Sequence, residues 1–534
     1  MHSKAARDVV RLLSVLGAQE TFQSSSSTSP TRRGPNAAEE LRELAGAATP
    51  RLCDVKHLRR RLGAVSLLVA AVVAACASAP PCSATAQSSE SADCAEPADK
   101  ARLNARGRAS FASIPIEDPS GRAMASFHSA LRAAEQKRGQ ARILIYGASH
   151  VAADVYPDLL RSRLQTRFGE GGPGFALPAK PLQHYRHGGI TIENSAGWTG
   201  VKASEHSEDT HYGLAGMYVV ANGKHPARTT FLTKPHAGVT GAASEFELFY
   251  WKQPGGGRFK LSIDGKPFEL SAAASDPGPA YEKWQVPDGQ HRVEITTRGD
   301  GPVRIFGVAL ERETPGVIVD ALGIPGFRAK SHLSWDDTLY REHLTRRHPD
   351  LVVLAYGTNE SGDAGQPIET YAGELRKVVG RIRHVVPNAS CLLVGPSDRP
   401  NKLGSKYLDR PRTAQVVATQ REVAREFGCG FFDLVAFMGG PMSMLEWCNG
   451  EPPLGASDHV HFTHRGYDAL GNVLHDALLM GYETPAALVF GPRPIAPPGS
   501  TISELKHNER NLREPDVVKP RRKVSASPSS PRSP

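Results

Sequence analysis

Cysteine and long apolar runs are both scarce in this chain of 534 residues. Only 7 cysteines are present, with no Cys-x2-Cys pair and no His-x3-His spacing, the patterns that usually indicate a structural zinc site. The length is ample for a buried core and for more than one domain. A small scaffold held together by disulfides or by a metal is therefore excluded.

One apolar run stands out, and it is short. Residues 59–76 read RRRLGAVSLLVAAVVAAC, and a basic cluster before a short apolar run is typical of a signal peptide, whereas a spanning helix needs about 20 apolar residues. The four residues 73–76 (VAAC) also resemble the lipobox of bacterial lipoproteins, which implies cleavage before Cys76 and lipidation of its thiol. Ordinary secretion, an uncleaved anchor and a buried helix are the alternatives.

The middle of the chain lacks net charge, although the chain as a whole is basic. The whole sequence carries +9, which raises nucleic acid or an anionic membrane surface as a partner. Residues 1–75 account for +5 and residues 497–534 for +4, so residues 76–496 carry no net charge. Since a nucleic-acid-binding domain concentrates positive charge in its folded part, we expect no nucleic-acid partner.

Three segments lack the periodicity of a folded domain. We expect a disordered or mis-assigned start over 1–58, a Ser/Ala/Pro-rich tether over 77–105 and a disordered tail over 483–534.

The remaining cysteines leave the disulfide pairing open. In an exported protein Cys82 can pair with Cys94, and Cys429 with Cys448, whereas the apolar run around Cys391 favours a packed thiol there.

The periodicity of the folded part predicts an α/β domain in two pieces, 106–184 and 316–482. Short apolar runs alternate with amphipathic helices, which indicates a parallel sheet covered by helices on both faces. Asp154 is the expected N-cap of the second helix. The expected strands are 142–146, 317–322, 351–355, 391–395 and 430–434, and the expected helices are 121–140, 154–168, 336–348, 368–385, 410–427 and 465–480.

Residues 185–315 differ from both flanking pieces. Helical periodicity is replaced by short alternating runs between turn residues, which predicts an inserted antiparallel β-sandwich. Its tryptophans, Trp198, Trp251 and Trp284, either stack on sugar rings or pack in the core. The clearest expected strands are 245–251, 258–263, 291–297 and 303–309.

Two candidate segments follow predicted strands of the α/β domain. Ser149, in the segment YGASH, is placed as a nucleophile at the edge of the sheet where ligands bind, although a serine there also serves as a turn or cap residue. In the segment GIPG, a glycine, Gly323 or Gly326, allows a backbone N–H to approach a reacting carbonyl. A plain turn is the other interpretation.

The other candidates come later in the chain. Asn359, in the segment YGTNE after a very apolar strand, can donate its amide N–H to an oxyanion, although Gly-Thr-Asn is also good turn chemistry. His461 can act as a general base, with Asp458 three residues earlier to orient it. His459 is the local competitor. A metal-binding pair of His459 and His461 lacks further ligands, so no metal is expected.

Ser, Gly, Asn and His in this order resemble the SGNH/GDSL hydrolase superfamily. The resemblance implies a flavodoxin-like parallel sheet sandwiched by helices and no cofactor. It also implies Ser149 as nucleophile and as one oxyanion donor through its backbone N–H, Gly326 and Asn359 as further donors, His461 as base and Asp458 as its orienting partner. The resemblance covers about residues 120–180 and 317–480. One departure is Ala148, which replaces the aspartate of the family's Gly-Asp-Ser.

A narrower resemblance rests on His150, on the segment FGEGGPGF at 168–175 and on the β-rich insertion. Together they are similar to periplasmic peptidoglycan O-acetylesterases, in which a carbohydrate-binding-module-like domain interrupts the hydrolase. This implies a serine esterase that removes O-acetyl groups from an acetylated cell-envelope glycan through an acyl-enzyme. We further expect export to the periplasm or outer membrane of a Gram-negative bacterium, with a lipid anchor. An O-acetyltransferase, a general esterase or lipase, and a non-catalytic glycan-binding lipoprotein are the alternatives.

Overall fold

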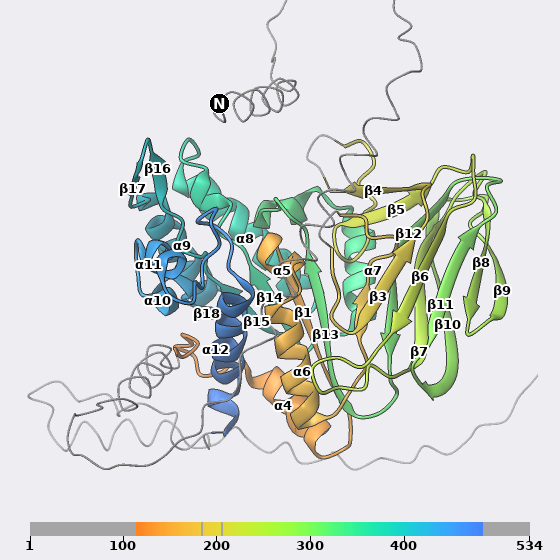
Figure 1. Ribbon diagram of the computed structural model, residues 1–534, viewed down its shortest axis with the longest axis horizontal. Coiled ribbons are helices and arrows are strands. Elements are labelled where there is room, and N and C mark those ends of the chain that lie inside the picture. Colours follow the sequence, from red (N-terminus) through yellow and green to blue (C-terminus); the bar gives the residue numbers. More distant parts are fainter. Residues whose placement is uncertain (1–113, 183–184, 204–206, 484–534) are drawn as a thin grey trace, which may run out of the picture. The chain divides into compact units, whose positions relative to one another are not determined.

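The computed structural model describes residues 114–182, 185–203 and 207–483 (Figure 1). The expected start segment, signal peptide, lipidated Cys76, tether and tail all fall on residues outside these ranges, apart from residue 483. Within the described residues, no helix combines the length and the apolar character needed to cross a membrane.

A parallel five-stranded sheet forms the centre of the α/β domain (Figure 1). Numbering its strands from the N-terminus gives the order 2-1-3-4-5, the flavodoxin-like order. The predicted fold class is therefore confirmed. Across the sheet the strands are β13 (Gly316–Gly323), β1 (Gln140–Gly147), β14 (Leu351–Ala355), β15 (Ser390–Val394) and β18 (Gly430–Phe432).

Helices cover both faces of this sheet because its strands are apolar on both sides. Ile143 and Ile145 of β1 pack with α4, α6 and α12, while Leu144 and Tyr146, pointing the opposite way, pack with α7, α8 and α9. The helices are α4 (Ala125–Glu135), α5 (Ser149–Ala152), α6 (Tyr156–Phe168), α7 (Asp337–Arg347), α8 (Ile368–Val385), α9 (Pro411–Glu426), α10 (Leu434–Met438), α11 (Ser443–Asn449) and α12 (His464–Glu483), with 3-10 turns at Ala329–Ser334 and Glu360–Gly362.

The predicted cap of α6 is wrong. Asp154 lies before the helix with a φ of 48°, and Val155 is the cap residue. The carboxylate of Asp154 instead accepts hydrogen bonds from the guanidinium of Arg161, at 3.2 and 3.4 Å. The Asp154 carboxylate therefore pairs with the buried Arg161 and does not cap the helix.

Two antiparallel sheets form the inserted β-sandwich (Figure 1). They pack face to face, for example through the rings of Tyr250 and Phe259, whose centroids are 5.4 Å apart. One strand, β2, comes before residue 185, the expected start of the insertion. The first sheet contains β10 (Gly278–Gly289), β7 (Ala243–Lys252), β12 (Val303–Glu311), β5 (Met217–Ala221) and β4 (Trp198–Lys202), with β2 (Gly174–Ala176) on β12; the second contains β3 (Ile190–Asn194), β6 (Arg228–Thr233), β11 (Arg292–Thr297), β8 (Arg258–Ile263) and β9 (Lys266–Ser271).

The tryptophans of the insertion belong mainly to its core. Trp251 is buried, and Trp198 and Trp284 are partly buried against the same core. This placement favours packing over a role as free sugar platforms.

A buried ionic network joins the sandwich to the parallel sheet. Arg347 on α7 bonds Glu311 of β12 at 2.6 Å and Asp320 of β13 at 2.7 Å, and Arg142 of β1 also bonds Glu311 at 2.9 Å. Burial opposes ionisation of Glu311, but Arg347 and Arg142 together lower its pKa to about 2. The Glu311 carboxylate is therefore charged at neutral pH, and its ion pairs connect the sandwich, the parallel sheet and α7.

Replacing Glu311 with glutamine is expected to lower the free energy of unfolding by about 3 kcal/mol at pH 7, because it removes the carboxylate that Arg142 and Arg347 share. The folded-state pKa of Glu311 is depressed, so its contribution is present above the unfolded pKa and is lost as pH falls toward about 2. Urea unfolding of both proteins should show the difference shrinking below about pH 4. Glu269→Gln, which breaks an exposed pair with Arg298, is the control, and an equal loss in both variants would contradict the prediction.

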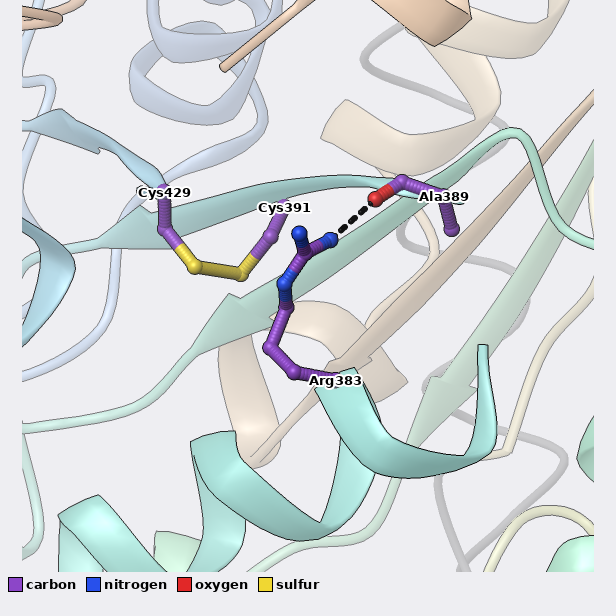
Figure 2. Close-up of a disulfide and its surroundings, with 4 residues drawn as sticks. All are labelled: Arg383, Ala389, Cys391 and Cys429. Atoms are coloured by element: carbon purple, nitrogen blue, oxygen red, sulfur yellow. Dashed lines mark hydrogen bonds between the residues drawn. A yellow bond between two sulfur atoms is a disulfide. The ribbon is translucent and has the colours of Figure 1, made fainter. Parts of the chain in front are cut away.

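A disulfide joins Cys391 of β15 to Cys429, the residue before β18 (Figure 2). The two strands are parallel neighbours, and the Cα atoms lie 4.6 Å apart. Beside the bridge, Arg383 of α8 donates to the carbonyl of Ala389 at 2.6 Å. The expected Cys429–Cys448 pair and the packed thiol at Cys391 are therefore wrong: adjacency in the sheet decided the pairing, and Cys448 is free.

The double variant Cys391→Ala/Cys429→Ala should unfold more easily than the oxidised protein. The bridge closes a loop with a sequence separation of 38 residues, for which lost chain entropy predicts a stabilisation of about 3–4 kcal/mol. Urea unfolding with and without a thiol reductant measures this. Reductant should destabilise the parent protein and leave the variant unchanged.

Candidate active site

The parallel sheet brings three of the candidate segments to one edge. At the end of β1, Gly147 lies opposite Gly323 of β13 on one side and Ala355 of β14 on the other. The three strands thus end level with one another, and the segments carrying Ser149, Gly326 and Asn359 leave the same edge. β1 and β14 flank the point where the strand order reverses, the usual place for ligands in such sheets.

Ser149 is in contact with a histidine that lies 312 residues later in the chain. Its hydroxyl Oγ is 2.7 Å from Nε2 of His461. The other ring nitrogen of His461, Nδ1, lies 2.6 Å from Oδ2 of Asp458. The arrangement is that of a serine whose proton passes to an imidazole held in one orientation by a carboxylate.

Asp458 is fixed as an anion by its own loop. Its Oδ1 accepts backbone hydrogen bonds from Val460 at 3.0 Å and His461 at 2.9 Å. Partial burial opposes ionisation, but the hydrogen bonds from the His461 ring and from these two N–H groups lower the pKa of Asp458 to about 2. The carboxylate therefore stays charged in the pH range in which an imidazole base works.

The competing residue, His459, points elsewhere. Its ring stacks on Tyr407, with centroids 4.4 Å apart, and its Nδ1 lies 3.2 Å from the Tyr407 hydroxyl. Tyr407 belongs to a hairpin of β16 (Asn401–Leu403) and β17 (Lys406–Leu408). In the part of the chain that the structure describes, no group of three or more potential ligands surrounds a metal position.

The two candidate glycines differ in what surrounds them. A Cβ on Gly323 would lie 2.2 Å from the backbone nitrogen of Ala152, so this glycine allows β13 to pack against α5. Gly326 has a φ of 84° and open space where a Cβ would stand. The segment at Gly326 is therefore the one whose backbone faces free space at the sheet edge.

Asn359 is held beside the Gly326 segment. Its side-chain Nδ2 donates to the carbonyl of Phe327 at 2.8 Å. One of the two amide N–H groups is used in this bond, and the other is left for an oxyanion. The bond fixes the asparagine next to the loop that carries the second expected donor.

Glu360 joins these two loops, a role that the sequence analysis missed. Its carboxylate accepts from the backbone N–H of Ala329 at 2.8 Å and from that of Gly357 at 3.0 Å. The side chain is buried, and this burial raises its pKa. The only signal in the sequence is an acidic residue directly after Asn359 in an otherwise neutral turn.

His150 is a second residue to which the sequence analysis assigned no role in the site. Its Nδ1 lies 3.0 Å from the Tyr467 hydroxyl and its Nε2 lies 3.4 Å from the Ser397 hydroxyl, and its ring packs against His461 at 5.3 Å. Burial, reinforced by the neighbouring His461, lowers the pKa of His150 to about 3. His150 is therefore neutral, and its ring packs against the proposed base, His461. In the same turn, Ala148 has no side-chain acceptor.

Replacing Asn359 with alanine is expected to lower kcat for 4-nitrophenyl acetate by about 10²–10³-fold, the usual cost of removing one oxyanion donor. The Michaelis constant should change little, because the lost bond matters mainly when charge develops on the carbonyl oxygen. Asn194→Ala, on the exposed end of β3, is the control. A fall in kcat of less than threefold would contradict a role in oxyanion binding.

Comparison with known proteins finds a family whose model matches part of the chain. A model of the GDSL-like lipase/acylhydrolase family matches residues 286–469. The matched range contains Gly326, Asn359, Asp458 and His461, whereas Ser149 lies before it. No curated protein matches the chain by sequence.

Among solved structures, a peptidoglycan O-acetylesterase is 27% identical, with a TM-score of 0.58, and the match covers 69% of this chain and 99% of that one. A family two carbohydrate esterase from Cellvibrio japonicus is 13% identical, with a TM-score of 0.22 and coverage of 55% and 98%. A salicylyl-acyltransferase from a tetracycline biosynthetic pathway is 14% identical, with a TM-score of 0.24 and coverage of 54% and 96%. The last two likenesses are too weak to support an argument.

Proposed function

We propose that this chain, a carboxylic ester hydrolase of the SGNH type, removes O-acetyl groups from a cell-envelope polysaccharide, and that this polysaccharide is peptidoglycan. The observation that carries the proposal is the chain of contacts from the Ser149 hydroxyl through His461 to Asp458, at 2.7 and 2.6 Å. The choice of substrate is supported by the 27% identity to the peptidoglycan O-acetylesterase, because the match spans nearly all of that protein.

The proposed reaction has two steps. Ser149 Oγ attacks the acetyl carbonyl while His461 takes its proton, and the negative oxygen is held by the N–H groups of Ser149, Gly326 and Asn359. His461 then returns the proton to the sugar oxygen, which leaves as a hydroxyl group. Water, deprotonated by His461, attacks the acetyl-serine, and His461 returns this proton to Ser149 Oγ as acetate is released.

Exposure of the site supports hydrolysis over acetyl transfer. The side chains of His461 and Asp458 are 38% and 50% exposed, so water has access to an acyl-enzyme. A transferase has to exclude water from that intermediate. The complete set of contacts around Ser149 likewise opposes the alternative of a non-catalytic glycan-binding protein.

The location of the protein is part of the proposal. Cleavage before Cys76 and lipidation of its thiol would anchor the enzyme in the periplasm or at the outer membrane, where acetylated glycans are within reach. The basic cluster, apolar run and cysteine of residues 59–76 are the only support for this location.

Acetate release tests the proposed function. Purified protein should release acetate from O-acetylated peptidoglycan faster than from acetylated xylan, and none from peptidoglycan that has first been de-acetylated with mild base. Hydrolysis of 4-nitrophenyl acetate without acetate release from peptidoglycan would leave an esterase of this fold and refute the proposed substrate.

A further inference from the structure

A pocket of about 510 Å³ is lined by residues that closely follow Ser149 and His461 in the chain. Its walls come from the start of α6, from the segment 185–192 that includes most of β3, from residues 234–237 and from the start of α12. Ala153 lines it, and the N–H of Ala153 bonds the Ser149 carbonyl at 3.0 Å. His464, three residues after His461, also lines it. The volume is in the range of small-molecule sites.

The acidic side chains of this pocket already have hydrogen-bond partners. Asp154 and Asp158 bond Arg161 at 3.2 and 2.7 Å, and Asp158 also bonds His236 of the sandwich at 2.5 Å. The backbone N–H of Gly188 donates to Asp154 at 2.9 Å.

At the mouth, the carboxylate of Asp468 is paired with His464 at 3.1 Å. Each carboxylate of the pocket therefore has a hydrogen-bond partner.

The cationic side chains of the same pocket are not neutralised. Lys180, Arg186 and Lys234 all line it, all are exposed, and they come from three separate segments of the chain. Among the residues that the structure describes, none of the three has a carboxylate within ion-pair distance. The pocket, called the cationic pocket below, thus combines free positive charge with concave shape.

We infer that the cationic pocket binds a carboxylate group of the glycan substrate while a neighbouring acetyl ester lies at Ser149. This inference rests on the proposed function and narrows it to an anionic acetylated glycan. Two sources share this chemistry: the peptide stems of peptidoglycan and the uronic acids of acidic polysaccharides. A neutral glycan such as unsubstituted acetylated xylan has no group for these cations.

The test uses the full chain and its double variant Lys180→Gln/Lys234→Gln. The substrates are O-acetylated peptidoglycan, the same material with its carboxylates converted to amides, an acetylated uronic-acid polymer and 4-nitrophenyl acetate. With native peptidoglycan the variant should show a KM about three- to tenfold higher at unchanged kcat, the range expected for exposed charge pairs. With the amidated material and with 4-nitrophenyl acetate it should match the parent protein.

Two further variants separate charge from folding. Lys180→Arg/Lys234→Arg keeps the charge and should behave like the parent, and Lys224→Gln/Lys266→Gln removes two exposed lysines that lie outside the pocket and should change nothing. Equal activity of the glutamine variant and the parent on every anionic substrate would overturn the inference. So would an equal loss on native and amidated peptidoglycan, or a loss that the arginine variant shares.

Failure of the proposed function gives a different result in these assays from failure of the cationic pocket. If the parent protein hydrolyses 4-nitrophenyl acetate but neither form of peptidoglycan, peptidoglycan is excluded whatever the lysine variants do. A KM effect confined to the uronic-acid polymer would then keep the cationic pocket and assign its carboxylate to a uronic acid.

Discussion

Replacing Ser149 with alanine is expected to lower kcat for 4-nitrophenyl acetate by about 10⁶-fold, the scale seen when the nucleophile of a serine triad is removed. The reason is that no other group takes its place: Ser149 is the hydroxyl 2.7 Å from His461. The hydroxyl of Ser397 lies 3.4 Å from His150 and bonds Thr358. Stopped-flow and end-point assays of 4-nitrophenol release measure the loss.

The fold should survive this change, since the loss of one hydroxyl leaves no buried cavity of note. The thermal unfolding midpoint should stay within about 2 °C of the parent value. A fluorophosphonate probe should label the parent protein and not the variant, while Ser405→Ala, in the exposed turn of the β16–β17 hairpin, keeps both activity and labelling. A variant that retains a tenth of the parent rate would remove Ser149 from the mechanism.

Local pattern was enough to predict the parallel sheet and the residues at its edge. Each strand is a short apolar run closed by glycine or a polar turn, and this signal survives because both faces of the sheet are buried. Once the strands are parallel, their ends must meet, which explains why Ser149 and Asn359 lie at one edge although more than 200 residues separate them. Predicting that these residues share one edge required only the parallel order of the strands, and no distance between atoms.

Side-chain contacts between different helices and strands could not be predicted from the sequence. Cys391 pairs with Cys429 because β15 and β18 became neighbours, and Asp154 gave up its role as a helix cap because Arg161 is buried beside it. Glu360 and His150 stayed without a role for the same reason, since their partners Ala329, Gly357 and Tyr467 are distant or unremarkable in sequence. Pairing of side chains depends on which elements pack together, and periodicity does not report that.

Replacing Asp458 with asparagine should lower kcat by about 10⁴-fold, because an amide no longer favours the tautomer of His461 that can accept the serine proton. In the parent protein the pKa of Asp458 is about 2, so its carboxylate is protonated only well below the range of the assay. The rate of the parent between pH 5 and 9 should therefore show no inflection from Asp458.

Asp468→Asn is the matched control, since Asp468 bonds His464 at 3.1 Å in the same way but has no contact with the serine. It should leave kcat for 4-nitrophenyl acetate within about twofold of the parent. A tenfold or smaller loss in Asp458→Asn would mean that the loop hydrogen bonds alone orient His461. The carboxylate would then serve the fold of the loop, through its bonds to the N–H groups of Val460 and His461, and the base would work without an ionic partner.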